Sequence, residues 1–373
     1  MNTTDIGANI NFQTIKKSAK LGYTDSMFLL GCWYADGYGT KVNMRRAGKW
    51  WRKAAKAGHV HAQYNTALMY FNGEGVKKSA EKAAEWYLKA AEQGHAVAQS
   101  ELGYAYENGL GVDKNPEKAR EWYQKSAEQG FALAEFNMGS IYERGIGVNK
   151  NLEEAFAWYR KSAEHGFAQA QRQVGYMYEK GLGVEENEEE SVNWTIRAAS
   201  QGDIMGLNNL ASKFEKGDVL KQDYQKAVEI YAQAAELGLP IAQRNLGAMY
   251  YEGKGVEQDY QKAFEWCMKA AEQGERLAQR MIGYLYYNGK GVPQNYEQAL
   301  FWYLKAAEQQ DTRSCRRVAV MYFEGLGVQP DEKKGEEWLK RAAELGDEKA
   351  IKFLEEKAAE EAESSKDSLT QEQ

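Results

Sequence analysis

The sequence predicts an all-α protein, a right-handed α-solenoid (superhelix) of nine 36-residue helix-turn-helix repeats with terminal capping helices. Three observations lead to this prediction. A short motif recurs every 36 residues, apolar residues with a helical period occupy the same places in each repeat, and glycine-rich turns separate the helices. With 43% hydrophobic and 27% charged residues, the chain can also bury a sizeable core.

The repeat is marked by motifs such as AKAG, AEQG and AELG, and we call the last residue of each motif the anchor. The anchors are Gly22, Gly58, Gly94, Gly130, Gly166, Gly202, Gly238, Gly274, Gln310 and Gly346. Nine repeats therefore cover residues 23–346. Residues 1–22 are predicted to form an N-terminal capping helix and residues 347–363 a C-terminal one, because each resembles half of a repeat. The polar, acidic residues 364–373 are predicted to be disordered.

The first helix of each repeat follows from positions counted after the anchor. Position 4 is mostly Ala, position 9 is Gly or Ala, and position 12 is Tyr or Phe in all nine repeats. At 100° per residue, positions 4, 8, 11 and 12 fall in one arc of about 100°. We therefore expect a helix over positions 2–14 that buries this arc.

A Gly-x-Gly-Val turn follows the first helix, and position 21 is then Asn, Ser or Asp in every repeat. These residues favour the N-cap of a second helix, and the anchor glycine favours its end. Trp stands at position 28 in eight repeats. We expect the Trp and Tyr rings of this helix to fill the space beside the small residue at position 9.

The pattern AxAQxxLGxxYxxGxGVxxDxxKAxxWYxKAAEQG, nearly intact in residues 98–130 and 242–274, resembles the Sel-one-like repeat (SLR) family, which is related to tetratricopeptide repeats. The resemblance implies a non-enzymatic scaffold, adaptor or regulator that holds a protein or peptide in a concave groove, and it includes bacterial toxin-neutralising proteins. Secreted relatives with a cysteine pair in each repeat are reported to bind penicillin, so a penicillin-binding or β-lactamase-like enzyme is the alternative. This chain has only Cys32, Cys267 and Cys315.

Composition and motifs exclude several other classes. A net charge of −6 argues against nucleic-acid binding, and the longest apolar run is too short for a membrane-spanning helix. No secretory signal is visible, so we expect a cytoplasmic protein. We expect no cofactor, no metal and no catalytic residue, because His59 and His61 are predicted to diverge around a helix and no ligand set joins them.

The partner-binding prediction rests on positions 3, 6, 10, 13 and 14, which point away from the buried arc. In the first four repeats these positions are aromatic and slightly acidic, whereas in the last five they hold seven basic and four acidic residues. The candidate residues are Arg172, Tyr176, Arg244, Tyr251, Arg280, Tyr284, Tyr287, Arg313, Arg316, Phe28, Tyr64, Phe71, Tyr104 and Phe136. Arg and Tyr are typical of binding hot spots, and the arginines favour a partner with an acidic segment. Alternatively, the arginines are solvated and pair with Glu residues of the neighbouring repeat.

Overall fold

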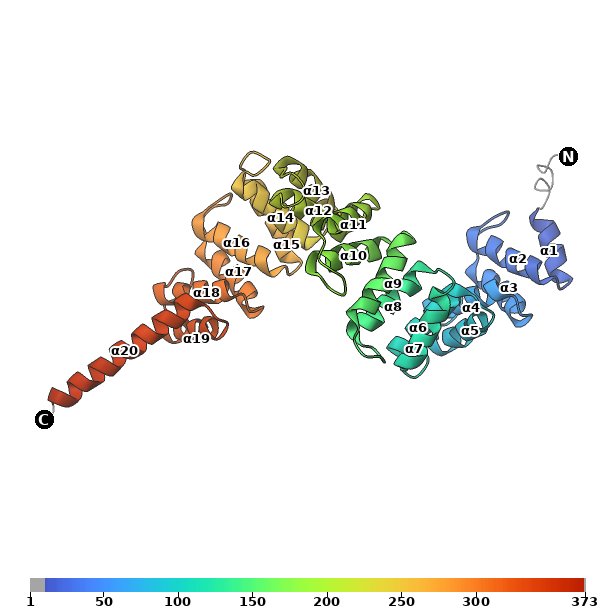
Figure 1. The fold of residues 1–373 in the computed structure, drawn as a ribbon, viewed down its shortest axis with the longest axis horizontal. Coiled ribbons are helices and arrows are strands. Elements are labelled where there is room, and N and C mark those ends of the chain that lie inside the picture. Colours follow the sequence, from blue (N-terminus) through green and yellow to red (C-terminus); the bar gives the residue numbers. More distant parts are fainter. Residues whose placement is uncertain (1–10, 372–373) are drawn as a thin grey trace. The chain divides into compact units, whose positions relative to one another are not determined.

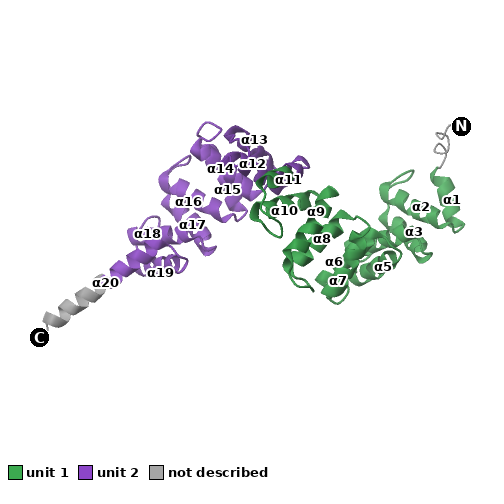
Figure 2. Ribbon diagram, viewed as in Figure 1, with its two compact units in different colours: residues 1–194 green, residues 195–373 purple. Residues whose placement is uncertain are grey.

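The structure, a computed structural model, describes residues 11–371, with side chains through residue 359. That range contains 20 helices and no strand, and the chain divides into two compact units, residues 1–194 and 195–373 (Figures 1 and 2). Each helix from α1 to α10 packs against the next one, and so does each helix from α12 to α20. The chain is therefore an all-α solenoid, as the sequence predicts.

The first helix of every repeat has 13 residues and covers positions 2–14, as predicted. These helices are α2 (Thr24–Asp36), α4 (Val60–Asn72), α6 (Ala96–Asn108), α8 (Ala132–Arg144), α10 (Ala168–Lys180), α12 (Ile204–Lys216), α14 (Pro240–Glu252), α16 (Arg276–Asn288) and α18 (Thr312–Glu324). Each ends at a glycine in the left-handed region, such as Gly73 with φ 82°. Glycine is required there because other residues are strained at this φ.

The second helices are α3 (Met44–Lys56), α5 (Ala80–Glu92), α7 (Pro116–Ala127), α9 (Leu152–Glu164), α11 (Glu188–Ser200), α13 (Tyr224–Glu236), α15 (Tyr260–Glu272), α17 (Tyr296–Glu308) and α19 (Glu332–Glu344). Their predicted N-caps at position 21 are confirmed. Asn115 Oδ1, for example, accepts a hydrogen bond from the Lys118 backbone N–H at 2.8 Å, and Asp259 Oδ1 accepts one from Lys262 at 2.9 Å. These bonds satisfy backbone donors that a helix leaves free at its start.

Of the Trp and Tyr rings expected beside the small position-9 residue, the structure places the Tyr there in most repeats. A Cβ on Gly103 would overlap the ring of Tyr123, which is fully buried, whereas Trp122 is only half-buried and carries the Lys125 ammonium 4.1 Å from its ring centroid. Position 29 is buried in all nine repeats: Trp51, Tyr87, Tyr123, Tyr159, Thr195, Tyr231, Cys267, Tyr303 and Leu339. Of the position-28 tryptophans, only Trp194 and Trp302 are buried. The expectation that Trp fills this space was therefore wrong for most repeats.

Glutamines account for two further parts of the repeat motif. In the third repeat, buried Gln99 at position 5 donates to the Ala91 carbonyl at 3.0 Å and accepts from Gln129 at position 35, at 2.7 Å. In the fourth repeat Glu135 and His165 occupy the same two positions and bond at 2.7 Å. Where both positions hold glutamine, as in the second, third, seventh and eighth repeats, the two side chains thus form a polar contact that ties the first helix to its neighbours.

The terminal helices are α1 (Phe12–Lys20) and α20 (Glu348–Gln371). In α1, Ile15 and Ala19 are buried against α2, as expected of a cap; residues 1–10 of the predicted cap lie outside the described residues. Ala350 of α20 is buried in the last core cluster. The single helix α20 crosses the predicted boundary between residues 363 and 364, so residues 364–371, predicted to be disordered, are helical in the structure. Beyond the boundary, Lys366, Leu369 and Gln371 are the residues with high helix propensity.

Candidate functional site

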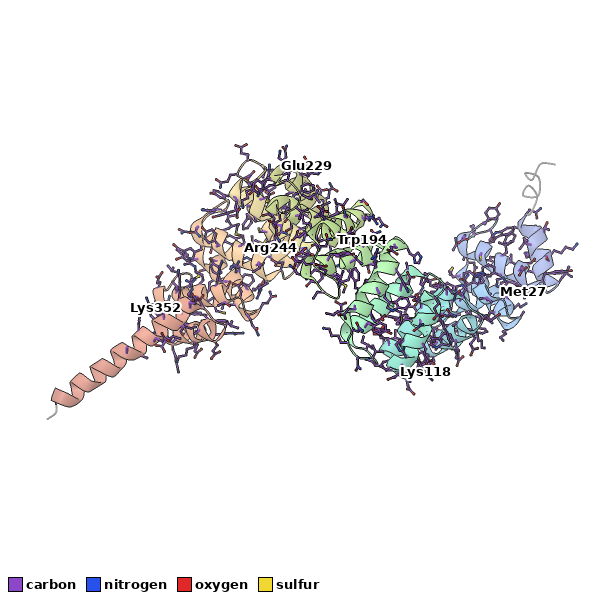
Figure 3. All side chains as sticks on the ribbon, in the orientation of Figure 1. Met27, Lys118, Trp194, Glu229, Arg244 and Lys352 are labelled. Carbon is purple, nitrogen blue, oxygen red and sulfur yellow. The ribbon has the colours of Figure 1, made fainter. Side chains whose placement is uncertain are left out.

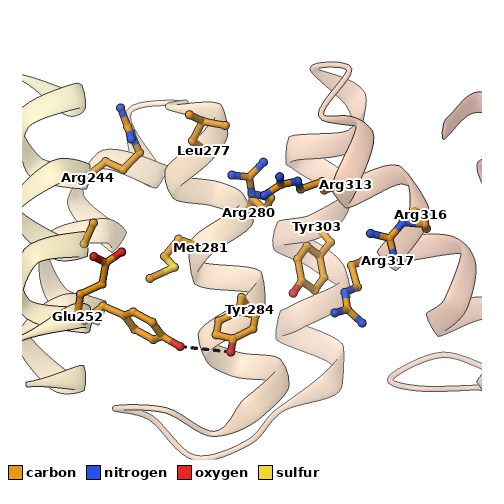
Figure 4. A pocket seen from close by; sticks show the side chains of 12 residues that line it. Arg244, Glu252, Leu277, Arg280, Met281, Tyr284, Tyr303, Arg313, Arg316 and Arg317 are labelled. Carbon is orange, nitrogen blue, oxygen red and sulfur yellow. Dashed lines mark hydrogen bonds between the residues drawn. The ribbon is translucent and has the colours of Figure 1, made fainter. Parts of the chain in front are cut away.

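The candidate site is a cavity of about 590 Å³ on the first helices of the last three repeats, α14, α16 and α18, within the second unit. It is lined by Arg244, Ala248, Tyr251, Glu252, Leu277, Arg280, Met281, Tyr284, Tyr303, Arg313, Arg316 and Arg317 (Figure 4). Figure 3 shows where Arg244, one of these residues, lies along the chain. Five arginines and one glutamate give the lining a positive charge on a protein of net charge −6.

The structure brings six predicted site residues together around this cavity. They are Arg244, Tyr251, Arg280, Tyr284, Arg313 and Arg316; Tyr287, predicted with them, does not line it. The other seven predicted residues belong to the first unit: Phe28, Tyr64, Phe71, Tyr104, Phe136, Arg172 and Tyr176. They are not part of this cavity.

Sequence reasoning missed three residues of the lining. Met281 and Arg317 occupy position 7, which lies only about 20° beyond the arc of the predicted positions on a helical wheel. A wider arc would have included them. Tyr303 comes from the second helix α17 and is nearly fully buried, so no surface pattern indicated that its ring reaches the cavity.

Three arginines at position 6 pair with an acid at the start of the next repeat. Arg280 Nη1 lies 2.9 Å from Asp311, Arg316 Nε lies 3.1 Å from Asp347, and Arg244 lies 3.5 Å from Glu275. The same acids cap the next helix: Asp311 Oδ1 accepts from the Ser314 backbone N–H at 2.9 Å. For these three arginines, the alternative of pairing between repeats is what the structure shows.

The two remaining arginines of the cavity, Arg313 and Arg317, are not paired in this way. Among the described residues, no carboxylate lies within ion-pair distance of Arg313 or Arg317. Arg313 is exposed, and the half-buried Arg317 places its guanidinium 5.7 Å from the ring centroid of Tyr287. Both side chains come from α18 and are one helical turn apart, so they present two cations on one face.

Two tyrosines of the lining, Tyr251 and Tyr284, bond to each other, and Tyr251 also bonds to Lys290, which lies outside the lining. Lys290 Nζ donates to the Tyr251 hydroxyl at 2.8 Å, which in turn donates to the Tyr284 hydroxyl at 3.2 Å. The bond to Tyr251 raises the pKa of Lys290, and the same residue raises the pKa of Tyr284. Because the Tyr251 hydroxyl proton is donated to Tyr284, the Tyr284 hydroxyl is the one left to donate to an anion.

In the first two repeats, the position-6 aromatics stack on the histidine that caps the next helix. Phe28 stacks on His59 with ring centroids 4.4 Å apart, and Tyr64 stacks on His95 at 4.8 Å. His59 and His95 each accept a backbone N–H bond with Nδ1 at 3.2 Å. The ring centroids of His59 and His61 lie 6.0 Å apart, and His61 bonds to His95 at 3.2 Å.

Neither metal binding nor thiol chemistry finds support in the described part of the chain. Its residues contain no group of three His, Cys, Asp or Glu side chains placed to hold a metal. Burial raises the pKa of Cys267 to about 12, so its thiol is not a reactive nucleophile. Between residues 11 and 371, no helix is both long and apolar enough to span a membrane.

Comparisons with known proteins follow the repeat. The Sel1 repeat model matches nine consecutive segments: 24–59, 60–95, 96–131, 132–167, 168–203, 204–239, 240–275, 276–311 and 312–347. The crystal structure of c5321, a protective antigen of uropathogenic Escherichia coli strains with an SLR fold, is 34% identical and has a TM-score of 0.74; the alignment covers 92% of this chain and 81% of that chain. A Sel1 repeat protein from Oxalobacter formigenes is 28% identical, with a TM-score of 0.48, and 94% and 90% are covered.

A third solved structure, the immunity protein PA5088 from Pseudomonas aeruginosa, is 21% identical with a TM-score of 0.40, and 57% of this chain and 80% of that chain are covered. No curated protein matches the chain. Sel1 repeat proteins are typically non-enzymatic helical scaffolds that bind other proteins. Because the repeat model covers residues 24–347 and the Escherichia coli protein shares a third of its residues with this chain, the chain belongs to the Sel1 repeat family.

Proposed function

We propose that this chain is a non-enzymatic interaction module, an adaptor or regulator, that holds a segment of a partner protein against α14, α16 and α18. The observation that carries the proposal is the cavity of about 590 Å³, whose arginines and tyrosines come from three successive repeats. This volume lies within the range of about 300–1,000 Å³ that is usual for ligand-binding pockets. Arginine and tyrosine dominate the energetics of protein interfaces because they combine a large contact area with hydrogen-bond donors.

The charge of the cavity favours a partner with an acidic segment. Its lining holds five arginines and one glutamate, whereas the whole chain carries a net charge of −6. A nucleic acid would be repelled by the chain as a whole, while a short acidic peptide experiences mainly the local field of the cavity. A protein that neutralises a bacterial toxin is a special case of such a regulator. The free thiols Cys32, Cys267 and Cys315 favour a cytoplasmic location.

The test blocks the cavity without breaking its ion pairs. Ala248 of α14 lines the cavity at position 10, where α6, α10 and α16 carry the tyrosines Tyr104, Tyr176 and Tyr284. The fold therefore tolerates Ala248→Tyr, whose ring would fill the cavity. Val320→Tyr, at the same position of α18 but outside the cavity, is the matched control.

Crosslinking and pull-down from the native cell would compare the parent with both variants. We expect a partner that the parent and Val320→Tyr capture and Ala248→Tyr loses, with no change in melting temperature. Equal capture by Ala248→Tyr would contradict this binding face. Covalent labelling of the parent by a fluorescent β-lactam would instead support the penicillin-binding alternative.

A further inference from the structure

We infer that Arg313 and Arg317 of α18 are the residues that bind the partner's acidic side chains, and that the neighbouring apolar floor of the cavity takes an apolar side chain of the same segment. The inference rests on the proposed function and names the chemistry of its partner: a segment in which Asp or Glu residues stand close to a Phe or Leu. The ladder arginines Arg244, Arg280 and Arg316 instead form the wall of the cavity.

The ion pairs divide the five arginines into these two roles. The side chain of Asp311 is only 5% exposed, and its partner Arg280 is 2.9 Å away. A ligand that took Arg280 would leave this carboxylate buried without its cation, which is strongly unfavourable. Arg313 and Arg317 have no carboxylate within ion-pair distance among the described residues, so a ligand that binds them breaks no ion pair.

The arrangement of the lining also sets the order of the bound side chains. Arg313 and Arg317 are contributed by α18, and Leu277, Met281 and the ring of Tyr303 supply apolar surface. Glu252 belongs to α14, on the other side of α16 (Figure 4). It pairs with Lys254, whose Nζ lies 2.6 Å from its carboxylate. The cavity therefore suits a segment with acids at α18 and an apolar residue beside them.

Synthetic peptides provide the probe, because the natural partner is unidentified. The test peptide has eight residues with an adjacent Asp and Glu, a Phe two residues later, and blocked termini, so that only side chains supply charge. One comparison peptide replaces the acids by Asn and Gln, and another replaces Phe by Gly. Fluorescence anisotropy with the full chain is expected to show binding at least tenfold weaker for each comparison peptide.

Matched variants locate the contact. Arg313→Ala with Arg317→Ala should weaken the test peptide more than tenfold and leave the melting temperature unchanged, because neither arginine holds an acid of the fold. Arg45→Ala with Lys49→Ala removes the same charge from an exposed turn of α3 and should leave binding at the parental level. Ala248→Tyr should weaken binding because it fills the cavity.

The outcomes separate this inference from the proposed function. If Ala248→Tyr abolishes peptide binding and the Arg313/Arg317 variant does not, the cavity is the binding face and the assignment of these arginines is overturned. If the acidic and neutral peptides bind equally, or the test peptide does not bind at about 1 mM, the acidic–apolar partner is overturned while capture of a native partner can still hold. If the native partner is captured equally by Ala248→Tyr, the proposed function of this face fails.

Discussion

The two units join successive repeats through the same pair of positions but with different chemistry. In the first two repeats of the first unit an aromatic at position 6 stacks on an imidazole that caps the next helix, as Tyr64 does on His95. In the second unit an arginine at position 6 pairs with a carboxylate that caps the next helix, as Arg280 does with Asp311. The segregation of aromatic and basic residues along the sequence is therefore, in large part, two solutions to one contact between repeats.

This comparison gives the arginine ladder, Arg244, Arg280 and Arg316, a structural role in joining repeats. Arginine recurs at position 6 because it pairs with the carboxylate that caps a helix 31 residues later. No ligand is needed to explain this recurrence. Arg313 and Arg317 stand at positions 3 and 7 and follow no such pairing. In a repeat protein, the residues that break the internal pairing are thus better candidates for binding than the residues that recur.

The largest expected effect concerns the core that both units share. Tyr123→Ala in the first unit and Tyr303→Ala in the second should each reduce the free energy of unfolding by about 3–5 kcal/mol, because each ring is buried against a glycine of the facing helix. Trp122→Ala should cost only about 1–2 kcal/mol, since its ring is half-buried. Chemical denaturation measures all three. A larger loss for Trp122→Ala than for Tyr123→Ala would contradict the core described above.

The second prediction exchanges the two kinds of contact. Arg280→Ala should cost about 1–3 kcal/mol because it leaves buried Asp311 without its cation, and the ladder variant Arg244/Arg280/Arg316→Ala should melt well below the parent. Arg280→Tyr with Asp311→His copies Tyr64 and His95 of the first unit and should recover part of the loss.

A double-mutant cycle of Arg280→Tyr and Asp311→His tests whether the two contacts are equivalent. We expect a favourable coupling energy of about 1 kcal/mol between the new side chains. Strict additivity of the two single changes would show that the stack and the ion pair are not interchangeable.

The third prediction is that the stability of the first unit depends more strongly on pH than that of the second unit. Burial lowers the pKa of His59 and His95 below their ordinary value near 6.5. Below about pH 6.5 these histidines are therefore more protonated in the unfolded chain than in the folded one. The free energy of unfolding consequently falls as the pH decreases from about 6.5 toward the lowered pKa values. Hydrogen exchange at about pH 7.5 and 5.5, corrected for the intrinsic rate, should show a selective loss of protection around α4 and α6.

Replacing both histidines by Asn, which caps helices and does not titrate, should remove this pH dependence. An equal loss of protection at the carboxylate-capped helices α16 and α18 would show that the histidines are not its source.

The smallest effect is expected in the irregular sixth repeat. Residues 203–238 should exchange faster than residues 95–130, because Val219 replaces the second turn glycine and Ile230 replaces the larger Trp. The structure adds Lys213, which stands at position 11, where Met177 and Met249 are buried in the flanking repeats. Uniform protection across both segments would contradict this prediction.

The sequence by itself determined the repeat length, the bounds of the helices, their caps and the direction in which each position faces. These follow from local rules, since a helix of 3.6 residues per turn and a capping side chain need no information from distant residues. Six of the residues around the cavity were predicted for the same reason: positions 3, 6, 10 and 13 face one way in every first helix.

Only the tertiary structure decided which neighbour each side chain meets. Positions 28 and 29 are adjacent in sequence, yet Tyr123 is fully buried and Trp122 is not, because the place of the facing Gly103 selects one ring. Likewise, helical periodicity predicted that Arg280 and Arg313 face the same way, but only Arg280 lies close enough to Asp311 to form an ion pair. Periodicity gives the direction of a side chain, whereas its pairing depends on distances between repeats, which are set when the helices pack.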